Sequence, residues 1–183
     1  AATSFSTGMA AISNTLFAFL TAGKRVVSLK DTYGGTSKIF LDFLPNYNIS
    51  VKLCDTTNHE EIETEVANGC DLLYLETPTN PTLDLLDLEW VGKFTKQHNL
   101  IFNIDNCFAT PIIQTPVDYG ADIIIHSATK FLDGQGRTMG GIVLGRKDLI
   151  KEVYSFCVNH FFNGIAFWKI YLNIYIVLFI RLV

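Results

Sequence analysis

The sequence has no paired or regularly spaced cysteines, and this absence argues against two common ways of stabilising a small protein. Its four cysteines, Cys54, Cys70, Cys107 and Cys157, form no CxxC pair. Neither a zinc site nor a disulfide framework is therefore expected. The histidines also lack a ligand spacing such as HxxxH, so we predict no bound metal. Reduced thiols are typical of the cytoplasm, which is the location that we predict.

Basic charge is scarce as well. The 183 residues carry a formal net charge of −4, and no basic stripe alternates with aromatic residues. Nucleic acid is therefore not an expected partner. No secretory signal peptide precedes the first apolar residues. Because the chain starts at Ala1 and runs directly into a Thr/Ser/Gly-rich segment, we expect it to be the interior of a longer protein.

Long uncharged apolar runs are also missing. The most apolar stretch, residues 161–183, is interrupted by Lys169 and Arg181, and the run between them is shorter than the roughly 20 residues of a membrane span. We expect no membrane partner. Because 49% of the residues are apolar, the rest of the chain has enough apolar surface for a core. We predict one domain over residues 1–158, followed by an atypical apolar tail over residues 159–183.

Segments with helical spacing alternate with short apolar runs typical of strands. Helices are expected at residues 9–20, 39–44, 58–66, 87–97 and 147–157, and strands at residues 25–28, 49–53, 71–75, 100–104, 122–125 and 141–145. This alternation predicts an α/β fold with a mostly parallel sheet between two helical layers. We expect a turn over residues 4–8 and a loop over residues 33–36, and we expect Pro45 to end the second helix.

Three polar residues follow three consecutive predicted strands: Asn80, Asp105 and Lys130. Ligands of such sheets bind beyond the carboxyl ends of the strands, so these side chains are expected at one edge. Each residue also has an ordinary structural interpretation: Asn80 could form an Asx turn, Asp105 could cap a helix, and Lys130 could lie at the surface. A lysine partly removed from water would instead offer a neutral amine that attacks an aldehyde. An aspartate there would keep a pyridine nitrogen protonated.

Other segments supply groups suited to a phosphate and an aromatic ring. The hydroxyls of Ser127 and Thr129 flank Ala128, and the N–H groups of Gly8 and Met9 begin a helix, where anions bind well. Simple capping of this helix by Ser6 or Thr7 is the alternative. Tyr33 could stack on a ring or be a half-buried loop residue. A lysine preceded by two hydroxyls suits a phosphorylated aldehyde cofactor.

The glycine-rich loop and Cys107 indicate neither a nucleotide site nor a thiol nucleophile. The loop, which comes after Lys130, lacks the GK[ST] of a phosphate-binding loop and precedes a strand, which disfavours a nucleotide site. Cys107 has no histidine suggested nearby, so packing rather than a reactive thiol is the expected role.

Five segments carry a resemblance to a known family: residues 6–11 (STGMAA), 33–36 (YGGT), 76–81 (ETPTNP), 105–111 (DNCFATP) and 127–130 (SATK). Together, and in this order, they resemble the Cys/Met-metabolism family of pyridoxal-phosphate (PLP) enzymes. The resemblance covers about residues 4–157. It implies the large domain of the aspartate-aminotransferase fold (fold type I).

The resemblance also implies roles for individual residues. Lys130 is similar to the lysine that bonds the cofactor aldehyde and moves protons, and Tyr33 to the tyrosine stacked on the ring, so both are predicted to be catalytic. Cofactor binding is implied for Gly8, Met9, Tyr33, Asn80, Asp105, Cys107, Ser127, Thr129 and Lys130. At Cys107 many relatives have threonine.

The loop at residues 133–137 (DGQGR) is most similar to that of O-succinylhomoserine sulfhydrylases. The implied reaction is γ-replacement, in which O-succinylhomoserine and sulfide give homocysteine and succinate. Cystathionine γ-synthase, γ-lyase and O-acetylhomoserine sulfhydrylase activities of the same family remain open.

Family members also have an N-terminal arm that reaches a neighbouring subunit and a C-terminal domain that supplies a carboxylate-binding arginine. We expect both to be missing from this sequence. The resemblance implies a homo-oligomer, a dimer of dimers, for the full-length protein. A catalytically inactive, truncated fragment is the alternative of another class.

Overall fold

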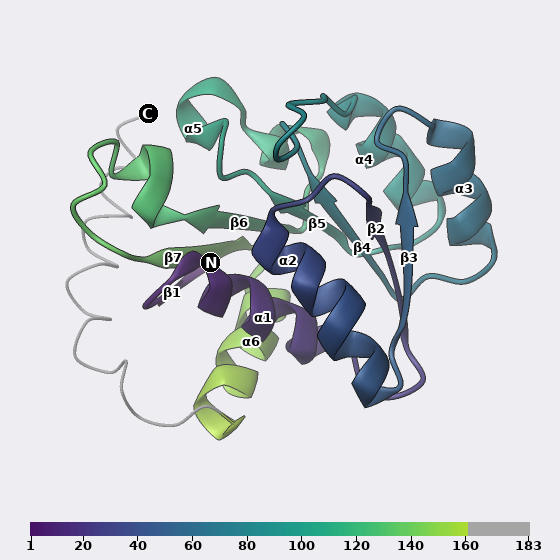
Figure 1. Cartoon of the computed structure of the whole chain (residues 1–183), viewed down its shortest axis with the longest axis horizontal. Coiled ribbons are helices and arrows are strands. Elements are labelled where there is room, and N and C mark those ends of the chain that lie inside the picture. Colours follow the sequence, from purple (N-terminus) through teal and green to yellow (C-terminus); the bar gives the residue numbers. More distant parts are fainter. Residues whose placement is uncertain (161–183) are drawn as a thin grey trace.

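A seven-stranded sheet lies between two layers of helices in the computed structural model, which describes residues 1–160 (Figure 1). The strands are β1 (Ala2–Phe5), β2 (Arg25–Leu29), β3 (Ser50–Cys54), β4 (Leu72–Glu76), β5 (Phe102–Asp105), β6 (Ile123–Ser127) and β7 (Gly141–Gly145). The α-helices are α1 (Gly8–Phe19), α2 (Gly34–Lys38), α3 (His59–Ala67), α4 (Leu88–Gln97), α5 (Thr110–Ile113) and α6 (Lys147–His160). The predicted three-layer α/β fold is confirmed.

The sheet order places the predicted site strands next to one another. The strands follow the order β1-β7-β6-β5-β4-β2-β3. The neighbouring strands β6, β5, β4, β2 and β3 pair in parallel. At one edge of the sheet, β7 pairs antiparallel with both β6 and β1. Because β4, β5 and β6 are adjacent and parallel, their carboxyl ends meet at one edge of the sheet.

Each face of the sheet has its own apolar core. Helices α1, α2 and α6 cover one face (Figure 1), where Leu16 and Phe40 are fully buried. Helices α3 and α4 cover the other face, where Ile62 and Val91 are fully buried. Fully burying one such side chain contributes about 1.5–3 kcal/mol, so the two cores fix how the helices lie on the sheet.

Side chains at three helix starts accept hydrogen bonds from the first turn. Thr7 accepts from Ala10 N–H at 3.0 Å. Asn58 caps α3 and Asp87 caps α4, at the residues where these two helices are expected to begin. These caps fix the first residue of each helix, and for α1 that residue is the predicted phosphate-binding Gly8.

Several short segments differ from the sequence predictions. Residues 2–5 form strand β1 rather than only a turn, because they pair with β7 more than a hundred residues later. The loop predicted at residues 33–36 already contains the start of α2. The helix predicted at residues 39–44 forms as the π-helix η1 (Ile39–Phe43) and ends before Pro45, as predicted. Pro45 lies in the first turn of a further 3-10 segment, η2 (Leu44–Tyr47), where its missing N–H removes no helical bond.

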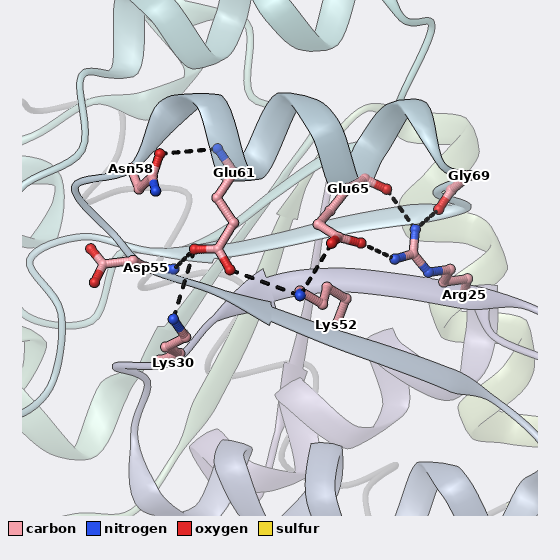
Figure 2. A network of polar contacts seen from close by, with 8 residues as sticks. All are labelled: Arg25, Lys30, Lys52, Asp55, Asn58, Glu61, Glu65 and Gly69. Atoms are coloured by element: carbon pink, nitrogen blue, oxygen red, sulfur yellow. Dashed lines mark hydrogen bonds and ion pairs between the residues drawn. The ribbon is translucent and has the colours of Figure 1, made fainter.

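The α3 helix is joined to the sheet by a network of charged side chains (Figure 2). Arg25 and Lys52 on the sheet both reach Glu65, at 2.5 and 3.1 Å. Lys30 and Lys52 reach Glu61 at 3.7 and 3.8 Å. Arg25 also donates to the carbonyl oxygens of Glu65, within the helix, and of Gly69, just beyond its end.

The sequence predicts a separate C-terminal tail that begins at residue 159. The first two residues of that tail complete α6, and the others lie outside the described residues. None of the helices within residues 1–160 combines the length and apolarity needed to cross a bilayer.

Candidate active site

A cavity of about 310 Å³ opens between the carboxyl ends of β5 and β6 and the start of α1. This volume is within the usual range for small-molecule sites. Its walls come from segments far apart in the sequence: Thr7, Gly8, Met9, Ile12, Tyr33, Asp105, Cys107, Ser127, Thr129, Lys130 and Met139. All the predicted cofactor-binding residues except Asn80 therefore line one cavity, as expected from the strand order.

The start of α1 forms one end of the cavity. Thr7 accepts the N–H of Ala10, and no described residue accepts the N–H groups of Gly8 and Met9. These two donors and the positive end of a twelve-residue helix favour an anion. A Cβ on Gly8 would lie 2.7 Å from Ser127 Cβ, so only glycine allows α1 to approach β6 this closely.

The segment after β6 carries the other predicted phosphate ligand and the lysine. The Thr129 hydroxyl accepts the Gly140 N–H at 3.1 Å, which fixes this turn against the following strand. Lys130 has φ −90° and ψ −125° within the irregular turn η4 (Ala128–Leu132). Its side chain lines the cavity but is exposed. Because the side chain is exposed, the partial removal of Lys130 from water that would favour attack on an aldehyde stays a prediction.

Asp105 lies at the floor of the cavity. It ends β5, is buried, and accepts the Cys107 N–H at 3.0 Å. The Tyr74 hydroxyl donates to its second oxygen at 3.4 Å. Burial raises the pKa of Asp105 to about 6, although these two hydrogen bonds oppose the rise. The carboxylate therefore remains ionised at neutral pH and can hold a protonated ring nitrogen.

Tyr33 is positioned by its backbone rather than by its ring. Its side chain is 41% exposed and lines the cavity, and its N–H donates to the Glu76 carboxylate at 2.9 Å. A Cβ on Gly35 would lie 2.8 Å from the Tyr33 ring and 2.6 Å from Met9 Sδ. Glycine at this position lets α2 pack closely against both side chains.

Asn80 is the predicted site residue that does not line the cavity. It lies in the loop after β4, and its backbone N–H bonds to the carboxylate of Glu76. The strand order brings this loop beside the Asp105 strand, as predicted. A contact between the Asn80 amide and a cofactor ring stays a prediction.

The cysteine at the cavity wall behaves as a packing residue. The Cys107 thiol lies 3.8 Å from the Ser127 carbonyl oxygen. Burial, with a contribution from the nearby Asp105 charge, raises the pKa of Cys107 to about 11. The thiol is therefore protonated at neutral pH, as the packing interpretation requires.

Sequence reasoning missed several residues of the site. Glu76, the last residue of β4, is 5% exposed and lies opposite Asp105 in the sheet register. Burial and the Asp105 charge raise the pKa of Glu76 to about 8. A carboxylic acid at the end of an apolar strand can be recognised in the sequence. The motif at residues 76–81, however, assigns Glu76 only to the start of the proline-rich loop. Thr7 is predicted only as a cap, and no pattern points to Ile12 or Met139.

A comparison with protein-family models matches residues 1–170 to one described as the Cys/Met metabolism PLP-dependent enzyme family. The chain belongs to this family. The family resemblance found in the sequence motifs is thus confirmed, and so is the association with PLP.

Individual relatives differ in their activity. The chain is 40% identical to an L-methionine gamma-lyase of Fusobacterium nucleatum subsp. polymorphum, over 84% of this chain and 39% of the relative. It is 34% identical to an O-succinylhomoserine sulfhydrylase of Pseudomonas aeruginosa, over 81% of this chain and 37% of the relative. A cystathionine gamma synthase structure from Xanthomonas oryzae pv. oryzae has a TM-score of 0.81 at 31% identity, covering 85% of this chain and 40% of the other. The chain spans about two fifths of the length of these relatives.

The residues of this cavity fit PLP. The N–H groups of Gly8 and Met9, which have no acceptor within residues 1–160, and the Ser127 hydroxyl beside them suit the phosphate group. The buried Asp105 carboxylate suits the ring nitrogen, and the exposed Tyr33 ring suits the ring face. Lys130 opens into the same cavity and suits the aldehyde.

Proposed function

We propose that the protein is a cytoplasmic PLP-dependent γ-replacement enzyme, which converts O-succinylhomoserine and sulfide to homocysteine and succinate. The observation that carries this proposal is the meeting of Lys130, Tyr33 and Asp105 with the start of α1 around one cavity. Membership of a PLP-dependent family supports the chemistry, and an O-succinylhomoserine sulfhydrylase among the relatives supports the substrate.

Each residue has a part in this reaction. When bound, PLP supplies an electron sink for carbanions next to the amino group of the substrate. Asp105 holds the ring nitrogen protonated through its charge. Lys130 Nζ carries protons to and from the Cα and Cβ atoms of the substrate, for which its exposed position in the cavity leaves room. Tyr33 holds one face of the ring.

The choice of O-succinylhomoserine rests on the loop at residues 133–137. Asp133 accepts the N–H groups of Gln135 and Arg137, at 3.3 and 2.8 Å, so the loop is shaped by its own first residue. It leads into Met139 at the cavity wall. Arg137 pairs with Asp133 at 3.6 Å, is otherwise exposed, and lies two residues before Met139 in the sequence, so we propose it as the cation that receives an acidic acyl group.

A second candidate is γ-elimination of L-methionine. The 40% identity to an L-methionine gamma-lyase favours it. The two activities differ in the step after the γ-substituent leaves. Sulfide adds in γ-replacement, whereas in γ-elimination water hydrolyses the remaining enamine to a 2-oxo acid and ammonia.

Cofactor binding is tested by mixing the purified chain with PLP and recording the visible absorbance band that PLP gains when a lysine bonds its aldehyde. We expect this band in the wild-type chain and its complete loss in Lys130→Ala. A Lys147→Ala variant, which removes a lysine at the start of α6, is the matched control and should keep the band. A wild-type chain without the band would refute cofactor binding by these residues.

Substrate choice is tested on the same preparation with two mixtures. One contains O-succinylhomoserine and sulfide, with homocysteine as the measured product. The other contains L-methionine alone, with the 2-oxo acid as the measured product. Homocysteine formation supports γ-replacement. A 2-oxo acid from methionine without homocysteine formation would favour the second candidate.

We also propose that the protein acts as a homo-oligomer, as the family resemblance implies. Exposed apolar side chains near the mouth of the cavity support this, among them Phe131 and Met139, with Ile112 and Ile113 on α5. Large exposed apolar patches commonly mark protein interfaces. Light scattering coupled to size exclusion should give a defined dimer or tetramer, and a monomer would contradict the proposal.

A further inference from the structure

A buried carboxylate outside the predicted site contacts two of its segments. Glu76 is 5% exposed and ends β4. It accepts the backbone N–H of Tyr33 at 2.9 Å and also the backbone N–H of Asn80. It lies directly opposite Asp105 in the pairing of β4 with β5. One side chain therefore joins the start of α2, the loop after β4 and the end of β5.

This placement is costly for a carboxylate. Within residues 1–160 no lysine or arginine forms an ion pair with Glu76, and its nearest charged neighbour, Asp105, has the same sign. An unpaired buried acid destabilises a fold unless hydrogen bonds compensate for lost hydration. The compensation here comes from two backbone N–H groups, and both belong to segments predicted to contact the cofactor.

The two hydrogen bonds that Glu76 accepts fix the backbone of Tyr33 and Asn80 rather than their side chains. The Tyr33 N–H bond fixes the residue whose exposed ring lines the cavity, at the point where α2 begins. If Glu76 is removed, the Tyr33 N–H loses its acceptor. It can then bond to water only if the start of α2 moves away from β4. The ring would then no longer have a fixed position at the cavity wall.

We propose that Glu76 is a positioning residue that holds the Tyr33 ring and the Asn80 loop in place for the cofactor ring. This inference rests on the proposed PLP function. Glu76 does not line the cavity, so it acts through Tyr33 and Asn80 rather than on the cofactor directly.

The central test measures PLP affinity by absorbance titration in Glu76→Ala, Tyr33→Ala and the double variant. The pKa of Glu76, raised to about 8, keeps its side chain mostly protonated at neutral pH. Loss of one hydrogen bond between uncharged groups typically weakens an interaction by up to about tenfold, and we expect a loss of PLP affinity of this order in Glu76→Ala. Because part of the effect of Glu76 passes through Tyr33, its removal in the Tyr33→Ala background should lower the affinity by less than its removal from the wild type does. Losses that multiply in the double variant, or an unchanged affinity in Glu76→Ala, would overturn the proposal.

Glu76→Gln guards against a variant that does not fold. Its amide oxygen can accept one of the two N–H groups, so its affinity should lie between those of the wild type and Glu76→Ala. Glu65→Gln, which alters a carboxylate in the α3 network, controls for a general loss of stability and should bind PLP as the wild type does.

Amide hydrogen exchange without PLP provides a second measurement. The Tyr33 and Asn80 amides should exchange faster in Glu76→Gln or Glu76→Ala than in the wild type, while amides of β5 remain unchanged. If the wild-type chain gives no PLP band, the proposed function fails, and exchange still decides whether Glu76 holds these segments. Equal protection in the wild type and in the variants would overturn the inference.

Discussion

Carboxylates on the two sides of this molecule lie in opposite electrostatic environments. On α3, Glu61 and Glu65 are surrounded by cations, and Lys52 bridges both (Figure 2). At the ends of β4 and β5, Glu76 and Asp105 lie opposite each other, and no described lysine or arginine pairs with either. Hydrogen bonds and the charges of Lys52 and Arg25 lower the pKa of Glu65, whereas burial raises the pKa values of Glu76 and Asp105.

The difference separates a structural use of charge from a functional one. The α3 network joins a helix to an edge of the sheet, and its charges compensate one another. The pair at the ends of β4 and β5 contributes nothing comparable to the fold, because burial and the charge of Asp105 raise the pKa of Glu76 to about 8 and no described cation pairs with either residue. Strongly shifted carboxylates in a cavity are typical of functional sites, where a ligand supplies the missing charge. A protonated ring nitrogen of PLP would supply it beside Asp105.

The largest effect that this comparison predicts is on cofactor binding in Asp105→Asn. The amide keeps the shape of the side chain but loses the charge that would hold a protonated ring nitrogen. Hydrogen bonds to charged groups are worth about 1.5–3 kcal/mol, so PLP affinity should fall by about 10- to 100-fold. Absorbance titration with PLP measures this, with Glu65→Gln as the matched control.

The same two variants can also show that the two carboxylate environments do not differ in function. If Asp105→Asn and Glu65→Gln change PLP affinity equally, the two carboxylate environments have no separate functions. An affinity of Asp105→Asn within about twofold of the wild type would show that the charge at the cavity floor does not act on the cofactor, because a charged hydrogen bond is worth more than that.

A smaller effect is predicted for the pH dependence of stability. The folded chain keeps the Glu76 proton up to about pH 8, whereas the unfolded chain releases it near 4.5. Between these values the folded state binds more protons, so the free energy of unfolding falls as the pH rises. Glu76→Gln cannot titrate, and its stability should decline less over this range.

Denaturant unfolding between about pH 6.5 and pH 8 isolates Glu76, because linkage to the other buried groups lies mainly outside this range. The pKa of Asp105 is raised to about 6, and burial lowers that of His126 to about 4 from 6.5. The unfolding midpoint of the wild type should fall toward pH 8 relative to that of Glu76→Gln. Parallel curves for the two proteins would show that Glu76 is already ionised at the lower end of this range.

Strands and helices could be predicted from the sequence where the signals are local. Apolar runs and caps such as Asn58 and Asp87 act within a few residues, and these elements formed where expected. Strand β1 depends on pairing with β7, and no local pattern carries that information. The 3-10 segment that contains Pro45 follows the end of η1, and a rule for α-helices does not describe such a turn.

Residues of the candidate site likewise differ in whether the sequence alone could predict them. Asp105 and Lys130 were predictable because strand ends converge in a parallel sheet. Glu76 was not, because its importance comes from the Tyr33 N–H, which only the folded chain brings within 2.9 Å. The exposure of Lys130 was equally hidden, since it depends on which segments cover the end of a side chain rather than on the strand before it.

The smallest predicted effect concerns the α3 network itself. Lys52→Met removes the cation that bridges Glu61 and Glu65 but keeps the apolar stem of the side chain. Ion pairs near the surface stabilise weakly and are screened by salt, so the melting temperature should fall by at most a few degrees, and less at high ionic strength. Lys96→Met on α4, which removes a lysine without an ion pair among the described residues, is the control and should change little. PLP affinity should be the same in both variants, because the network and the cavity floor are electrostatically separate. A loss of affinity in Lys52→Met alone would show instead that the charges around α3 reach the cofactor.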